Sequence, residues 1–161
     1  MFDIAPPHPA DKAGLYDALL AAADAVTADE SDAVANMANV AALVWQFLPD
    51  LNWAGFYRLI DGDLILGPFQ GKPACIRIPP GKGVCGAAAA QRATQLVEDV
   101  NAFPGHIACD PASASEIVVP VMRAGQLIAV LDLDSPLRAR FDSLDARGLE
   151  ALARCIAPRL G

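Results

Sequence analysis

The sequence predicts an α+β fold, in which a six-stranded antiparallel sheet carries N- and C-terminal helices packed on one of its faces. Near both ends of the chain, apolar residues recur at three- and four-residue steps, which is the period of an amphipathic helix. In the middle of the chain this period falls to two, as in strands. Short turns with Gly and Asp separate consecutive strands, and such hairpins build an antiparallel sheet.

Helices are predicted at four places along the chain. The first begins at Asp11, and the second follows Ser31, which resembles an N-cap, and ends before Pro49. A short alanine-rich helix is predicted over residues 84–92, and a closing helix over about 142–157. The apolar side chains that the closing helix is expected to bury are Leu144, Leu149, Leu152 and Ile156.

Six strands are predicted between the second and the last helix. They cover residues 52–60, 64–69, 75–78, 95–98, 116–122 and 126–134. Turns at 61–63 and 123–125 join two pairs of them as hairpins. Residues 99–114 show no regular period, so we expect an irregular segment before the fifth strand.

Length and composition indicate one globular domain. We expect it to span residues 11–161, after a flexible, proline-containing leader at residues 1–10. The apolar fraction of 54% excludes a disordered chain, and no apolar run reaches the ~18 residues of a membrane span. The net charge of −7 argues against nucleic acid or an anionic membrane as a partner. The chain begins without the residues of an export signal, so we expect a cytoplasmic protein.

Three cysteines gather in the middle of the chain, at Cys75, Cys85 and Cys109. Without export such thiols stay reduced, which favours a redox or catalytic role over structural bridges. Cys85 falls in the first turn of a predicted helix, where the helix dipole is expected to lower the thiol pKa. The alternative for all three is that they are small core residues, as we expect for Cys155 on its apolar helix.

A metal site made of these cysteines is disfavoured by their spacing. They are separated by ten and twenty-four residues, whereas structural zinc sites use pairs two to four residues apart. His106, three residues before Cys109, leaves a Cys/His site open as a weaker alternative. Thiol redox chemistry fits better, because a sulfenic acid on one cysteine is resolved by a second thiol as a disulfide. We therefore expect no metal and no cofactor.

Acidic residues and aromatic residues are each predicted to share a face of their own strand. Asp132 and Asp134 point to the same side of their strand, and Glu116 can join them from the neighbouring strand. Trp53 and Tyr57 also share a face, as an aromatic wall with a gap between them. Exposed strand ends and simple core packing are the alternatives. Converging acids and aromatics would suit a small zwitterionic ligand with an ammonium group.

Several motifs together resemble the free methionine-(R)-sulfoxide reductases, a family of stand-alone GAF domains. They lie at residues 66–75, 77–86, 97–100, 105–110, 115–118 and 130–135. The resemblance runs from about residue 15 to the closing helix, and the cysteine steps agree together with their flanking residues. It implies a GAF-like fold and a homodimer. It also implies reduction of free L-methionine (R)-sulfoxide to L-methionine, with thioredoxin restoring the enzyme.

The resemblance also implies a role for each candidate site residue. Cys109 matches the catalytic nucleophile, Cys75 matches its resolving partner, and Cys85 assists. The matched substrate-binding residues are Glu116, Asp132 and Asp134, with Trp53 and Tyr57 at the S-methyl end of the substrate. Glu116 and Asp132 are also expected to be catalytic, because a sulfoxide reacts poorly until its oxygen is protonated or hydrogen-bonded.

Two other functions remain possible from the sequence. One is a non-enzymatic GAF module that senses a small molecule, since a fold alone does not fix a function. The other is a thiol-dependent peroxide sensor, in which the acids would serve only solubility. Turnover of free methionine sulfoxide, compared with turnover of peroxide, separates the three hypotheses.

Overall fold

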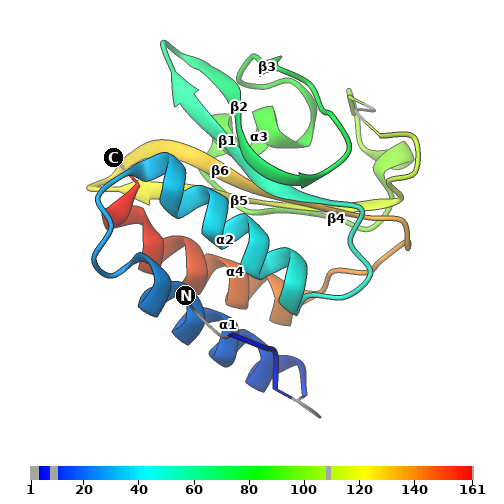
Figure 1. Cartoon of the computed structure of the whole chain (residues 1–161). Coiled ribbons are helices and arrows are strands. Elements are labelled where there is room, and N and C mark those ends of the chain that lie inside the picture. Colours follow the sequence, from blue (N-terminus) through cyan, green and yellow to red (C-terminus); the bar gives the residue numbers. More distant parts are fainter. Residues whose placement is uncertain (1–3, 8–10, 108–109, 161) are drawn as a thin grey trace.

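A six-stranded antiparallel sheet forms the centre of the molecule, with the strand order β3-β2-β1-β6-β5-β4 (Figure 1). The computed structural model describes residues 4–7, 11–107 and 110–160. The strands are β1 (Trp53–Ile60), β2 (Asp63–Gly71), β3 (Arg77–Ile78), β4 (Gln95–Val97), β5 (Ser115–Arg123) and β6 (Gln126–Ser135). This architecture confirms the predicted α+β fold with a six-stranded antiparallel sheet.

Helices cover both faces of the sheet, but unequally (Figure 1). One face carries α1 (Lys12–Thr27), α2 (Ala33–Phe47) and α4 (Ser143–Ile156), so the predicted N- and C-terminal helices share one side. The short α3 (Gly83–Gln91) lies on the opposite side. Two single 3-10 turns, η1 (Val100–Ala102) and η2 (Ala157–Arg159), complete the described elements.

The alternation of side chains along the strands divides the core into two layers. Ala54 and Phe56 of β1 pack in the layer under the three long helices. Trp53 and Tyr57 of the same strand belong to a second apolar cluster on the α3 side. The α3 side of the sheet is therefore covered by a second apolar cluster and is not an open sheet face. The candidate site residues lie on this side.

Two details of the helices differ from the sequence prediction. Asp32, not Ser31, caps α2, and its side chain accepts a hydrogen bond of 2.8 Å from the backbone of Ala35. Leu144 was expected to be buried, but 40% of its surface is exposed. In the first turns of α4, the buried face contains Leu149 and the polar residue Asp145, which lie four positions apart. Leu144 lies beside this buried face and is therefore partly exposed.

Part of the proline-containing start of the chain contacts the helical layer. Ile4 packs against the core cluster under the helices, and its carbonyl accepts a 2.7 Å hydrogen bond from the side chain of Gln46. Across the described residues, no helix combines the length and the apolar character needed to cross a lipid bilayer.

Candidate functional site

A pocket lies between the α3 side of the sheet and the loops that cover it. Strands β1, β5 and β6 form its floor, and the first turn of α3 forms one wall. Residues 72–74, His106, Ile107, Asp110 and Ser113 contribute to the rim. The predicted site residues that line it are Trp53, Tyr57, Cys85, Glu116, Asp132 and Asp134.

Strand register explains why these residues meet. β6 pairs with both β1 and β5, so Asp134 lies opposite Trp53 on one side and opposite Glu116 on the other. Asp132, two residues earlier, lies on the same face and is opposite Gly55. The structure confirms that the acids share one face and that the two aromatics share one face, and it brings both sets together in one pocket. Their roles in binding and catalysis remain predictions.

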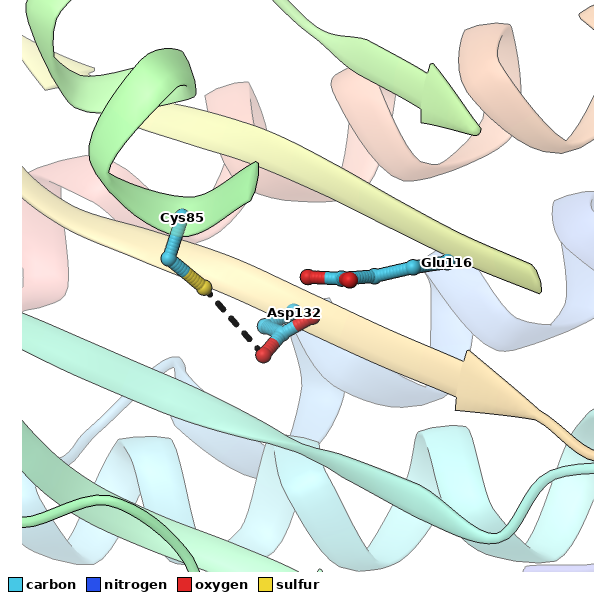
Figure 2. A group of neighbouring side chains, drawn as sticks. All are labelled: Cys85, Glu116 and Asp132. Carbon is cyan, nitrogen blue, oxygen red and sulfur yellow. Dashed lines mark hydrogen bonds between the residues drawn. The ribbon is translucent and has the colours of Figure 1, made fainter. Parts of the chain in front are cut away.

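Cys85, Glu116 and Asp132 point toward one another from three elements, α3, β5 and β6 (Figure 2). The Cys85 thiol donates a 3.2 Å hydrogen bond to Oδ2 of Asp132. One sulfur and two carboxyl oxygens of the three side chains lie within 4.8 Å of one another, and all three residues are buried. Oδ1 of Asp132 is also buried and has no hydrogen-bond partner among the described residues.

Burial raises the pKa of the three acids on the floor of the pocket, Glu116, Asp132 and Asp134. The pKa of Glu116 is well above its usual value because of desolvation, and the charges of Asp132 and Asp134 raise it further. Desolvation and the Asp134 charge likewise raise the pKa of Asp132. For Asp134 burial raises the pKa to about 6, against a hydrogen bond from Ser113 that lowers it. These shifts favour the protonated form of the buried carboxyl groups, and a protonated carboxyl group can donate a hydrogen bond.

The prediction that the helix dipole lowers the pKa of Cys85 is wrong. Burial raises the pKa of this thiol well above its usual value, and the nearby carboxylates of Asp132 and Glu116 raise it further. The dipole of the nine-residue α3 acts only within its first turn, and two acids close to the sulfur oppose it. Cys85 is consequently a neutral thiol, not a reactive thiolate.

The other cysteines occupy different surroundings. Cys75 is half-buried in the loop before β3 and is disulfide-bonded. Cys109, the predicted nucleophile, lies outside the described residues. Cys155 was expected in the core, but it is half-buried, and its thiol lies 3.7 Å from the exposed carboxylate of Asp24. Cys155 lies at the edge of the buried face of α4, so it is partly exposed although its neighbours in sequence are apolar.

Three aromatic rings, rather than two, form the apolar wall. Trp53 stacks on Tyr57 with ring centroids 5.8 Å apart, and on Phe69 of β2 at 5.2 Å. The gap expected between Trp53 and Tyr57 is filled, because a Cβ atom at Gly55 would lie 2.3 Å from the Cβ of Phe69. Lys72 fixes the indole further, since its carbonyl accepts a 3.1 Å hydrogen bond from Nε1 of Trp53.

The rim of the pocket contains polar residues that sequence reasoning did not place there. His106 Nε2 lies 3.7 Å from Oε2 of Glu116, and desolvation lowers the pKa of this imidazole. Asp110 accepts hydrogen bonds from Asn52 (3.2 Å) and Lys72 (3.4 Å). His106 and Asp110 lie in the irregular segment 99–114, where no periodicity tells which way a side chain points. The available signals were their polar character and their place in the motif at residues 105–110.

Asp110, on the rim, differs from the acids inside the pocket in the direction of its pKa shift. Backbone and side-chain hydrogen bonds, led by the one from the Ala112 amide, lower the pKa of Asp110. Asp110 therefore stays ionised at the mouth of the pocket while burial favours protonation of Glu116 and Asp132 inside it. The Asp110 carboxylate is paired there with Lys72 at 3.4 Å, and Lys82 also lines the pocket, so the mouth carries charges of both signs.

Comparison with known proteins agrees with this architecture. Residues 30–158 match the GAF domain family. The free methionine-R-sulfoxide reductase of Escherichia coli is 54% identical over 129 residues, which cover 80% of this chain and 78% of that protein. The enzyme of the same name from Saccharomyces cerevisiae is 43% identical over 154 residues, covering 91% of this chain and 86% of the relative.

A solved structure shows the same fold at high similarity. The free methionine-R-sulfoxide reductase of Neisseria meningitidis, crystallised in complex with its substrate, superposes with a TM-score of 0.95 at 46% identity. The match covers 99% of this chain and 96% of that one. With identity well above 30% over most of each relative, the chain belongs to the free methionine-(R)-sulfoxide reductase family of GAF domains.

Proposed function

We propose that this protein is an oxidoreductase that reduces free L-methionine (R)-sulfoxide to L-methionine. The observation that carries the proposal is the pocket itself, in which buried carboxyl groups with raised pKa values face a stacked aromatic wall. Such a pocket offers an apolar surface for a thioether methyl group and hydrogen-bond donors for a sulfoxide oxygen. The named relatives support the same activity.

Selection of the free amino acid is assigned to Asp134. Its carboxyl group lies next to the rim with a pKa of about 6, so a cationic ammonium group would bind the ionised form. Trp53 and Tyr57, which stack beside it, would take the S-methyl end. Acylation of the substrate nitrogen removes its charge and leaves the carboxylate without a partner, which disfavours peptides.

Glu116 and Asp132 would activate the sulfoxide. A hydrogen bond or proton from either group to the sulfoxide oxygen weakens the S–O bond and makes the sulfur electrophilic. Their raised pKa values keep a proton available near neutral pH, and this proton ends on the oxygen that leaves the substrate.

Cys109 is the proposed nucleophile and Cys75 the proposed resolving thiol. The thiol of Cys109 takes the sulfoxide oxygen, so methionine leaves and a sulfenic acid forms on the cysteine. The thiol of Cys75 then attacks this sulfenic acid, which expels water and forms a disulfide. Thioredoxin, a dithiol, would reduce the disulfide and regenerate both thiols. In support, Cys75 is already disulfide-bonded, whereas Cys85 is a buried free thiol suited only to an assisting role.

The proposal is tested with separated epimers of free methionine sulfoxide. Thioredoxin and thioredoxin reductase couple turnover to NADPH oxidation, and we expect activity on the R epimer alone. The Cys109→Ser variant should show no turnover, because a serine hydroxyl does not replace a thiolate at sulfur. Equal activity on both epimers, activity on peroxide alone, or an active Cys109→Ser variant contradicts the proposal. The homodimer, the cytoplasmic location and the domain limits of 11–161 remain predictions.

A further inference from the structure

We propose that Cys85, Glu116 and Asp132 together bind a thiophilic divalent cation of the Zn²⁺ class. The site uses one cysteine and two carboxylates from separate elements, and it is unrelated to the cysteine spacing considered from the sequence. It does not depend on the proposed reaction. It does share two carboxylates with the proposed substrate pocket, so an ion bound there would exclude the substrate.

The geometry of the three side chains fits a tetrahedral ion. Their potential ligand atoms lie within 4.8 Å of one another, and Sγ of Cys85 is 3.2 Å from Oδ2 of Asp132. Zn²⁺ binds sulfur at about 2.3 Å and oxygen at about 2.0–2.2 Å, which places neighbouring ligand atoms ~3.5 Å apart. Figure 2 shows the three groups converging on one point from the sheet and from the start of α3. The Cys85–Asp132 pair is slightly closer than this ~3.5 Å spacing, and the three ligand atoms lie within 4.8 Å of one another, so small side-chain shifts bring all three to coordinating distance.

An independent observation points to a ligand at this place. Oδ1 of Asp132 is buried in a side chain that lines the pocket, and no amide, hydroxyl, thiol or cationic group of the described residues donates a hydrogen bond to it. The remaining partner of the Asp132 side chain, besides the Cys85 thiol on Oδ2, is another acid, Glu116. A buried carboxyl oxygen without a partner is unfavourable, and a cation removes this penalty. The ion pairs of the described residues give Asp132 no cationic partner, so no lysine or arginine already fills this position.

The donor set selects the class of ion. A thiolate with two carboxylates disfavours Mg²⁺ and Ca²⁺, which prefer oxygen ligands alone, and suits Zn²⁺ or Co²⁺. His106, with Nε2 at 3.7 Å from Oε2 of Glu116, places a nitrogen donor of the kind that Zn²⁺ also uses beside the group. Three protein ligands with a fourth position toward the rim form an open site, which a water or an imidazole completes.

Co²⁺ is the probe for the experiment, because a thiolate bound to it gives a charge-transfer absorption band. The measurement uses the oxidised protein, in which Cys75 is disulfide-bonded and Cys85 stays a free thiol. It also carries Cys155→Ser, which removes the other free thiol of the described residues. We expect one Co²⁺ per chain with the thiolate band, and displacement of Co²⁺ by one equivalent of Zn²⁺.

Substitutions in this background test each ligand. Cys85→Ser should abolish the band, and Asp132→Asn and Glu116→Gln should each weaken Zn²⁺ binding by about tenfold or more. Asp110→Asn is the matched control: it removes a carboxylate from the same pocket but not from the group, and should leave affinity unchanged. Circular dichroism verifies that each variant is folded. Absence of saturable binding, a band that survives Cys85→Ser, or equal losses in Asp110→Asn and Asp132→Asn overturns the proposal.

Discussion

Glu116 and Asp132 are acids kept in the protonated range by their surroundings. Neither has a lysine or arginine partner in the described residues, and both are almost fully buried. Burial is the largest cause of the raised pKa of each group, and Asp134 adds its negative charge to both. A group that holds a proton at neutral pH inside an apolar pocket is suited to general acid catalysis.

Glu116→Gln tests this assignment at the level of a single residue. Glutamine keeps the size and the hydrogen-bonding capacity, but it cannot transfer a proton. We expect the methionine-forming step to slow by about 10²–10⁴-fold, with a smaller change in substrate affinity. In the wild type, the rate should fall as pH rises through the raised pKa of the carboxyl pair, because the required proton is lost. Single-turnover rates across pH measure both effects. A variant with the wild-type rate and pH profile would make Glu116 a bystander.

Cys75→Ser separates the chemical step from recycling. The first turnover should survive, since the nucleophile is intact, but the sulfenic acid then lacks its resolving thiol. We expect one equivalent of methionine per chain in a burst, followed by loss of thioredoxin-coupled turnover. Rapid-quench measurement of methionine, together with NADPH oxidation, distinguishes the two phases. Unchanged steady-state turnover would transfer the resolving role to another thiol, with Cys85 as the next variant to test.

How far the sequence predicts single residues depends on whether a regular element carries them. Strand alternation was enough to place Asp132 and Asp134 on one face, because the side-chain period of a strand is fixed. The pKa of Cys85 was predicted in the wrong direction, since it depends on acids that are thirty or more positions away in sequence. His106 was not placed in the pocket because its segment has no period.

At the level of elements, the attachment of α1 to α4 depends on one buried carboxylate. Asp145 has no exposed surface and accepts hydrogen bonds from Tyr16 (2.8 Å), Lys12 (2.7 Å) and Arg140 (3.2 Å). It also accepts one from the backbone of Asp142, which completes the capping box of α4. The Asp145 side chain therefore caps the N-terminus of α4, connects α4 to α1 by hydrogen bonds, and pairs with the charges of Lys12 and Arg140.

Asp145→Ala is expected to lower the free energy of unfolding by about 3–5 kcal/mol, because it leaves buried donors and charges without their partner. For a domain of this size, the melting temperature should fall by about 10 °C. Thermal unfolding followed by circular dichroism measures the change. The control is Asp24→Ala at the other end of α1, where an exposed carboxylate pairs with Arg159 and little change is expected. Equal effects of the two substitutions would contradict the assigned role.

Element boundaries show a similar division between what local sequence determines and what packing determines. The helix ending before Pro49 and the turns after β1 and β5 follow from local residues, and the structure has them. Ser31 and Asp32 are both good caps, so sequence alone could not choose between them. The burial of Asp145 in place of Leu144 depends on Tyr16 and Arg140, which lie elsewhere in the chain.

At the level of the whole molecule, the two layers of the core serve different purposes. The helical layer is almost wholly apolar. Its buried Asp145 has close partners, whereas Oδ1 of the buried Asn36 has no hydrogen-bond partner among the described residues. The α3 layer mixes an apolar cluster with three acids that share a pocket. Ionising these acids in the folded protein is unfavourable, so a site built for binding and proton transfer lowers the stability of the fold.

Asp134→Asn measures this loss of stability. The pKa of Asp134 is raised to about 6 from 3.8, so between these values the folded protein holds a proton that the unfolded chain releases. The free energy of unfolding therefore falls as pH rises through this window and stays lower above it. Asparagine is neutral in both states, so the variant should be more stable than wild type at pH 7.5, by about 1–3 kcal/mol. At a pH below 3.8 the two proteins should melt alike.

Asp142→Asn supplies a control of opposite sign. A hydrogen bond from Lys12 is the main reason that the pKa of Asp142 is lowered to about 2, so its ionised form stabilises the fold at neutral pH and not in acid. Asparagine keeps the helix cap but loses the charge, so the melting temperature should fall at pH 7.5 while that of Asp134→Asn rises. Two outcomes would contradict this account: a shift of both melting temperatures in the same direction at pH 7.5, or an equal gain in stability of Asp134→Asn in acid. In either case, ionisation of Asp134 does not destabilise the folded protein.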